Sequence, residues 1–219
     1  HRLLSALDGD ARLGAVAPAL VGPGQERFQL RRLPTLGSLL REAALVNRVR
    51  PENRRFRHER YLDVDRGEPF DVEQPAAAAL LVKRSLFDEL GGFDDAFVPA
   101  WFEDVDLCAR IWKSGRSIGY LPAVQATHVG GTTMEALPYR DFLPLYTRNL
   151  FRYLARHAPA GQRALARLIV GGGALARLLL LAVTKGDHGR GDAAHAYLRV
   201  LRGVSGLGWR TALATTERS

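Results

Sequence analysis

The 219-residue sequence has a single cysteine, Cys108, and no apolar leader at its start. One cysteine excludes a disulfide within the chain and a metal site built from several cysteines, which fits a reducing compartment. His1 and Arg2 open a short amphipathic segment, with neither an initiator methionine nor the apolar core of a signal peptide. We therefore expect a piece of a longer protein.

Long apolar runs free of charge are also scarce. Residues 163–183 come nearest to a membrane span, but they contain three arginines and three consecutive glycines, and an arginine is costly at the centre of a bilayer. At about 100° per residue, Arg163, Arg167 and Arg177 fall within one arc and leucines lie on the opposite side. The spacing predicts an amphipathic helix that lies in a bilayer interface. A helix packed on the protein's own core, with its arginines in water, is the alternative.

What the sequence does contain is charge, unevenly placed. Residues 148–219 hold 12 of the 31 Lys and Arg but only 3 of the 23 Asp and Glu, so this third has a net charge of +9 and the remainder −1. Such an asymmetry points to an anionic partner, either a membrane surface or a nucleic acid. The 47% hydrophobic content fits a globular chain of one domain, or of one domain with an appendage.

Hydrophobic periodicity predicts alternating strands and helices, followed by a helical tail. The polar stretch 51–69 has no period and is expected to be a loop. No internal repeat is present. Strands that alternate with helices predict α/β layers. The expected elements are the end of a helix at residues 1–8, strands at 13–20, 117–122 and 123–131, helices over 35–49, from 85 and from 103, and helices after Pro138.

Residues 100–112, AWFEDVDLCARIW, contain a cluster of acidic residues. Glu103, Asp104 and Asp106 follow two aromatic residues, and carboxylates this close repel one another. Acids are favoured in the first turn of a helix, where unpaired N–H groups stabilise negative charge, so these residues fit a helix start. The alternative is that the carboxylates take part in chemistry, and the surrounding motifs decide between the two.

Residues 76–131 resemble the acceptor half of inverting family 2 glycosyltransferases, in particular the rhamnosyltransferase-like branch. The shared motifs occur in the same order as in that family: the apolar run ending in LLVKR, then GGFDD, then FEDVDL, then the strand SIGYLP and a final HVGG. Two departures are that GGFDD ends in Asp95, where glutamate is usual, and that Ala100-Trp101 replaces Met-Tyr. The resemblance covers about 55 residues and implies an A-type, Rossmann-like fold.

The resemblance also implies a nucleotide-binding half that precedes these motifs and ends in a metal-binding aspartate pair. We expect this half to be missing from the sequence. Asp8-Gly9-Asp10 and residues 62–66, LDVDR, have the letters of such a pair. The first follows a helix end and the second comes in the wrong order, so neither is expected to be the metal motif.

The family's chemistry assigns a role to the acids. In a single displacement at the anomeric carbon, a carboxylate takes the proton of the attacking sugar hydroxyl, and the resemblance gives that role to Asp104. Glu103 would orient a substrate hydroxyl or tune the base. Trp101 would stack on the acceptor sugar, whereas Phe102 is expected in the core. Asp106 would contact the acceptor, unless it faces inward or caps the helix.

The histidine of HVGG occupies the family's position for a metal and diphosphate ligand. The resemblance therefore implies that His128 binds a divalent metal, Mg or Mn, together with carboxylates. A lone histidine at a strand end is more often a surface or hydrogen-bonded residue, which is the alternative.

The sequence thus predicts a partial A-type glycosyltransferase (Rossmann-like) α/β acceptor half over residues 1–136 and a basic amphipathic helical tail over 137–219. The intact enzyme would move a sugar, plausibly rhamnose from its dTDP form, from a nucleotide-sugar donor to a lipid-linked or polysaccharide acceptor. It would act in the cytoplasm as a peripheral protein on the inner membrane face, on an anionic surface, with no nucleic acid. A non-enzymatic basic helical module that binds membrane or nucleic acid is the rival, and a catalytically dead relic of a transferase is a third reading.

Overall fold

The computed structural model describes residues 1–50, 53–129, 137–181 and 189–209. Contacts between residues divide the chain into two compact units. The first unit comprises residues 1–33 and 51–130, and the second comprises residues 34–50 and 131–219. Residues 34–50 therefore belong with the C-terminal helices, although they lie within the first predicted segment, 1–136.

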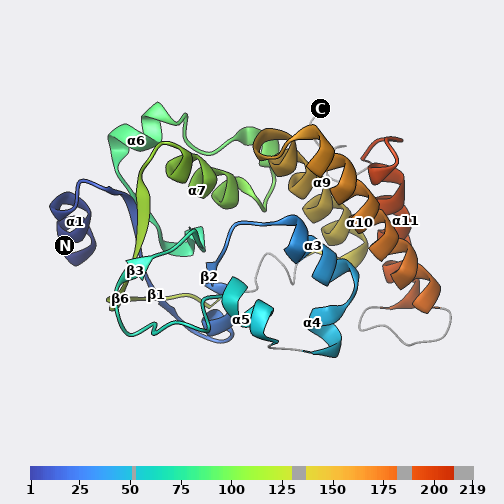
Figure 1. The fold of residues 1–219 in the computed structure, drawn as a ribbon, viewed down its shortest axis with the longest axis horizontal. Helices are drawn as coiled ribbons and strands as arrows, with labels where there is room; N and C mark the ends of the chain where they lie inside the picture. Colours follow the sequence, from blue (N-terminus) through green and yellow to red (C-terminus); the bar gives the residue numbers. More distant parts are fainter. Residues whose placement is uncertain (51–52, 130–136, 182–188, 210–219) are drawn as a thin grey trace. The chain divides into compact units, whose positions relative to one another are not determined.

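The first unit is built on a four-stranded mixed sheet with the order β3-β6-β1-β5 (Figure 1). Its central strands, β1 (Leu13–Val21) and β6 (Ser117–Thr127), are parallel. The short strands β5 (Leu81–Val82) and β3 (Phe70–Asp71) pair antiparallel with β1 and β6. A separate antiparallel pair joins β2 (Leu30–Arg31) to β4 (Gln74–Pro75). The predicted α/β architecture is therefore present, with one parallel pair at its centre.

The two central strands differ in how well the sequence predicted them. The apolar run that forms β1 is buried over most of its length, as expected for 13–20. In contrast, the two strands predicted at 117–122 and 123–131 are one strand, β6, which ends at Thr127; residues 130–131 of the prediction lie outside the described residues. Its register shifts after Leu121, which pairs with Pro18, and resumes at Gln125 opposite Ala19. Pro122 lies in the irregular part, where its missing N–H costs no ladder hydrogen bond, so the strand continues past it.

Helix α7 (Glu103–Lys113) begins at the predicted residue and packs along β6 (Figure 1). Its buried residues Leu107, Cys108 and Ile111 join the main core of the first unit. The remaining helices of this unit are short: α1 (Arg2–Gly9), α2 (Gln25–Phe28), α5 (Arg54–Glu59), α6 (Arg84–Glu89), and the 3-10 turns η1 (Ala77–Ala79) and η2 (Asp95–Phe97).

The predicted loop at 51–69 is wrong in part, because it contains α5. Asn53 caps this helix by accepting a hydrogen bond from the backbone N–H of Phe56. The helix has only 6 residues and is held by its cap. So few residues cannot show a hydrophobic period, which explains why periodicity did not predict this helix.

The second unit is helical. It contains α9 (Tyr139–His157), α10 (Ala160–Leu180), α11 (Arg190–Val204), α3 (Leu36–Ala43) and α4 (Val46–Val49). The helix predicted over 35–49 is two helices, because Leu45 adopts a left-handed conformation with φ 59° between them. Thr35 and Ser38 form a capping box at the start of α3.

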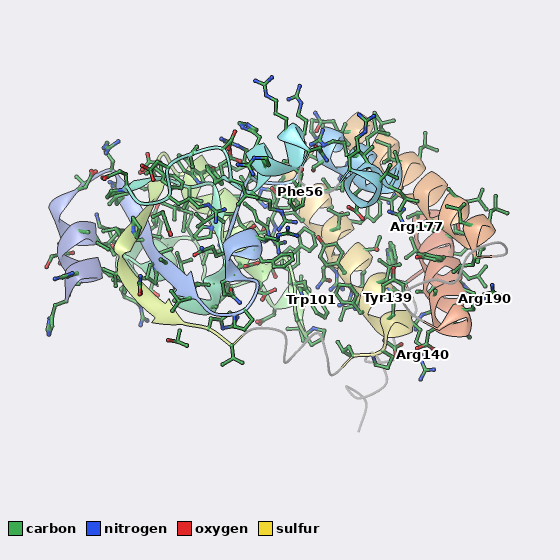
Figure 2. The ribbon with its side chains drawn as sticks, turned by 90° about the horizontal axis from the view of Figure 1, so that it is seen from below. Phe56, Trp101, Tyr139, Arg140, Arg177 and Arg190 are labelled. Carbon is green, nitrogen blue, oxygen red and sulfur yellow. The ribbon has the colours of Figure 1, made fainter. Side chains whose placement is uncertain are left out.

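Close backbone contact and ion pairs hold these helices together. A Cβ at Gly173 of α10 would lie 2.8 Å from the Cβ of Ala43, so glycine permits α10 and α3 to approach. At the other end of the unit, Arg140 of α9 pairs with Asp192 of α11 at 3.2 Å. Tyr139 and Tyr197 meet edge to face beside this pair (Figure 2). Gly173 therefore serves packing, and α10 runs through the three glycines 171–173 unbroken.

No helix in the described part of the chain is both long and apolar enough to cross a bilayer.

Candidate active site

A pocket of about 560 Å³ opens in the first unit beside the start of α7. Part of its wall is apolar and comes from the segment around η1 and from residues 97–100. Four carboxylates also line it: Asp94 and Asp95 from the start of η2, and Glu103 and Asp104 from the first turn of α7. The remaining lining residues are Ala76, Ala77, Ala78, Phe93, Phe97, Val98, Pro99 and Ala100. Glu103 and Asp104 of the acidic cluster therefore line a cavity.

The backbone just before α7 is in an uncommon conformation. Trp101 and Phe102 both have positive φ, 69° and 76°, a region that non-glycine residues rarely enter. Phe102 is buried, and this packing holds the turn in place. Two successive left-handed residues cost free energy and persist where the surrounding structure imposes them, commonly at functional sites. The turn lets α7 begin abruptly, with Glu103 and Asp104 at the pocket wall.

Asp104 is the best-supported carboxylate of the pocket. One oxygen, Oδ1, accepts the backbone N–H of Val105 at 2.8 Å, and the other, Oδ2, accepts the side-chain amide of Gln74 at 3.3 Å. The backbone N–H of Ala77 also favours the ionised form and lowers the pKa of Asp104. Burial nevertheless dominates and raises the pKa of Asp104 above its ordinary value. A carboxylate that is held in place and is more basic than usual suits proton abstraction.

Glu103 differs from Asp104 in having an oxygen without a partner. Its Oε2 atom is buried and accepts no hydrogen bond from the described residues. Burial raises the pKa of Glu103, and the neighbouring charge of Asp104 raises it further. A buried acceptor without a donor costs free energy. This oxygen can therefore accept a hydrogen bond from a hydroxyl group of a ligand.

Asp106 lies away from the pocket, in the interior. Its side chain is 0% exposed and accepts the Nε–H of Arg110 at 2.7 Å. The same guanidinium donates to the carbonyl oxygens of Leu90 and Gly92, each at 2.7 Å. The pair therefore ties α7 to the Gly91-Gly92 turn that leads into the pocket wall. Of the roles considered for Asp106, the inward-facing one matches this geometry, and contact with an acceptor gains no support from it.

A residue that the sequence reasoning missed is Gln74. It is buried, and its amide reaches Asp104 across 30 positions of sequence. Its strand is fixed at the neighbouring Glu73, whose carbonyl accepts the indole N–H of Trp112 at 3.1 Å. Arg32 pairs with the Glu73 carboxylate at 2.7 Å. A lone glutamine before an apolar run carries no periodic signal, so only the pairing of distant segments reveals it.

Asp94 and Asp95 were also not assigned to the site from sequence. Asp94 caps η2 by accepting the N–H of Ala96 at 2.8 Å. The GGFDD motif supported the family resemblance, and the structure now places both of its aspartates on the pocket wall.

Trp101 and His128 do not line the pocket. Trp101 directly follows the lining residue Ala100 and is partly exposed; Figure 2 labels it. His128 follows the end of β6, where its backbone N–H donates to the carbonyl of Val21 at 2.9 Å. No cluster of three or more His, Cys, Asp and Glu among the described residues has an arrangement that holds a metal. Acceptor stacking by Trp101 and metal binding by His128 therefore stay predictions, and Gly130-Gly131 of the HVGG motif lies outside the described residues.

Comparison with known proteins relates the chain to sugar-transferring enzymes. It is 31% identical over 97 residues to the rhamnosyltransferase WbbL of Escherichia coli K12, across 44% of this chain. It is 33% identical over 132 residues to an N-acetylglucosaminyl-diphospho-decaprenol L-rhamnosyltransferase of Mycobacterium tuberculosis H37Rv, across 58% of this chain. It is 30% identical over 135 residues to the pre-mycofactocin glycosyltransferase of the same strain, across 60% of this chain.

The matches cover only part of each relative, namely 36%, 40% and 26% of their respective lengths. No protein-family model matches the chain. These similarities support a relationship to glycosyltransferases, including rhamnosyltransferases, and they agree with the resemblance found in residues 76–131.

Proposed function

We propose that this chain is the acceptor-binding half of an inverting, A-type family 2 glycosyltransferase that acts in cell-envelope glycan synthesis. The sugar is rhamnose, delivered by a nucleotide-sugar donor such as its dTDP form, and the acceptor is lipid-linked or a growing polysaccharide. The observation that carries this proposal is the pocket in which Asp104, with a raised pKa, is held by Gln74 beside Glu103.

The side chains of the pocket have different roles in the proposed reaction. Asp104 takes the proton from the attacking hydroxyl of the acceptor as that oxygen forms its bond to the anomeric carbon and the nucleoside diphosphate leaves. Glu103 accepts a hydrogen bond from a second acceptor hydroxyl with its unpartnered oxygen. The apolar wall, including Phe97 and Pro99, packs against the C–H groups of the sugar and keeps water from the base. Trp101 at the rim stacks on a further part of the acceptor.

A divalent metal, Mg or Mn, would neutralise the leaving diphosphate when bound. The described residues do not form a complete site for it, so no step here depends on one. His128 would contribute a ligand only together with carboxylates from elsewhere in the complete protein. A lipid-linked acceptor and this donor place the enzyme at the inner face of the cytoplasmic membrane.

The decisive experiment is Asp104→Asn in the complete protein that contains this chain. Loss of the base lowers turnover about a hundredfold or more, while circular dichroism and the melting temperature show a folded protein. Asp88→Asn is the matched control, because Asp88 is an exposed carboxylate on α6 paired with Arg84 at 2.7 Å. Turnover within a factor of about two of the unsubstituted enzyme in Asp104→Asn would refute the assignment.

A further inference from the structure

Helix α10 of the second unit exposes several of its leucines and turns one of its arginines inward. Arg177 is turned inward between α10 and α3, where it donates to the backbone carbonyls of Ala43 and Glu42 (Figure 2). The small residues Ala166, Gly173 and Ala174 are buried on the same side. The leucines point outward instead: Leu168 is 73% and Leu179 is 66% exposed.

The outward side of α10 is apolar over its whole length. Leu165 and Leu175 are also exposed, and at about 100° per residue they fall within the same arc as Leu168 and Leu179. Gly172 lies within this arc and Ala164 and Ala176 lie at its two edges, and all three are exposed and uncharged. We call these seven residues the leucine face. Scattered exposed leucines are normal, but a continuous apolar face of this kind marks an interaction surface.

A second pocket, of about 320 Å³, adjoins the leucine face. It is lined by residues of α9 and α10, and Ala164 belongs both to its lining and to the leucine face. Arg163 and Arg167 stand at its wall, and neither forms an ion pair with a carboxylate in the described parts of the chain; Arg163 donates only to the carbonyl of Ala155, at 3.3 Å. The other lining residues are Phe151, Ala155 and Ala160. An apolar pocket with two uncompensated guanidinium groups suits an anionic group attached to an acyl chain.

We propose that the leucine face and the pocket of Arg163 and Arg167 together dock the second unit on an anionic lipid bilayer. The leucines enter the boundary between headgroups and acyl chains, and the two arginines bind lipid phosphates at the edge of the face. This site is independent of the proposed sugar transfer, because every residue in it belongs to the second unit. Arg177, the third arginine of the predicted arc, takes no part in this site, because its guanidinium donates to the backbone carbonyl of Ala43 in α3.

Charge favours a bilayer over the other occupants. Residues 148–219 have a net charge of +9, so pairing this face with a second copy brings like charges together, whereas an anionic surface attracts them. A nucleic acid attracts the same charge, but its phosphate backbone offers no apolar partner to four leucines.

The test measures sedimentation of the chain with phosphatidylglycerol–phosphatidylcholine vesicles and with pure phosphatidylcholine vesicles. We expect binding to the anionic vesicles only. The double variant Leu168→Gln, Leu179→Gln lowers the partition coefficient by about tenfold or more, because it removes apolar area from the interface. The double variant Arg163→Gln, Arg167→Gln lowers it on the order of tenfold and reduces its dependence on salt.

The matched control is Leu198→Gln, an exposed leucine (54%) on α11 that lies outside the face. All these positions are exposed or at a pocket wall, so the melting temperature should stay unchanged and exclude unfolding. Equal binding by the leucine double variant and by Leu198→Gln would overturn the proposal. So would preference for duplex DNA over anionic vesicles, or a dimer in light scattering that the leucine double variant abolishes while vesicle binding is absent.

Discussion

The two units depart from the usual distribution of polar and apolar residues in opposite ways. In the first unit, carboxylates line the wall of a pocket. Asp104 has hydrogen-bond partners there, whereas the Oε2 atom of Glu103 has none among the described residues. In the second unit, leucines of α10 face outward while Arg177 is turned inward. Buried polar groups and exposed apolar faces are the informative exceptions in a folded chain. The comparison teaches that the first unit places carboxylates at a pocket and the second exposes leucines, and the two proposals rest on these exceptions.

The largest expected effect on stability comes from the buried ion pair of the first unit. Asp106→Ala leaves Arg110, only 16% exposed, without its carboxylate, and we expect a loss of about 3–5 kcal/mol in the free energy of unfolding. Urea denaturation measures the loss. Asp88→Ala, which removes an exposed pair with Arg84, is expected to cost less than about 1 kcal/mol. Similar losses in the two variants would show that the Asp106 pair is not structural.

The packing of the second unit offers a matched pair of glycines on neighbouring positions. Gly173→Ala forces a methyl group against Ala43, 2.8 Å away, and is expected to destabilise the unit by about 1–3 kcal/mol. Gly172→Ala meets nothing within 4 Å, and because alanine favours helix it should stabilise by up to about 1 kcal/mol. Thermal unfolding of both variants measures these two changes in stability. Two effects of the same sign would contradict the assignment of inward and outward sides of α10.

A smaller effect is expected from the residue that positions the base. Gln74→Leu removes the amide donor to Asp104, so turnover of the complete enzyme should fall about tenfold. Because that hydrogen bond favours the ionised carboxylate, its loss should also move the acidic limb of the pH–rate profile to higher pH. A variant with lower turnover and an unmoved acidic limb would mean that Gln74 acts through packing alone.

The smallest effect concerns Glu103 and the pH dependence of stability. A carboxyl group whose pKa is raised on folding favours the folded state below its unfolded pKa, and this contribution is lost as the pH rises through the folded value. Glu103→Gln removes that loss and should raise the free energy of unfolding at pH 7 only slightly, because water screens this partly exposed group. The gain should vanish in acid, where Glu103 is protonated.

Melting temperatures of Glu103→Gln across the acidic range measure this gain. The exposed Glu89→Gln is the control, and it should show no comparable pH-dependent difference. A gain in Glu103→Gln that persists unchanged in acid would argue that its charge is not the cause.

Local patterns predicted a large part of both units. The run that forms β1, the start of α7 at Glu103 and the opposed arginine and leucine sides of α10 follow from residues close together in sequence, whose spacing matches a helix or a strand. The acidic cluster was also predicted as a site, and Glu103 and Asp104 do line a pocket. The predicted roles of Trp101 and His128 depend on a bound acceptor and a bound metal, which no local pattern describes.

By itself, then, the sequence determined which residues share a side of each element and where the acidic helix begins. Only the tertiary structure decided which side is covered and by what. Periodicity distinguishes two sides of a helix, but the side that is buried depends on distant partners, such as Ala43 for Gly173 of α10. In the same way, the amide of Gln74 donates to Asp104 only because two segments far apart in the chain are brought together. Arg110 likewise reaches the carbonyl of Leu90 in a turn that is distant in sequence. Those pairings are set by the free energy of packing the whole unit, in which no single segment carries the information.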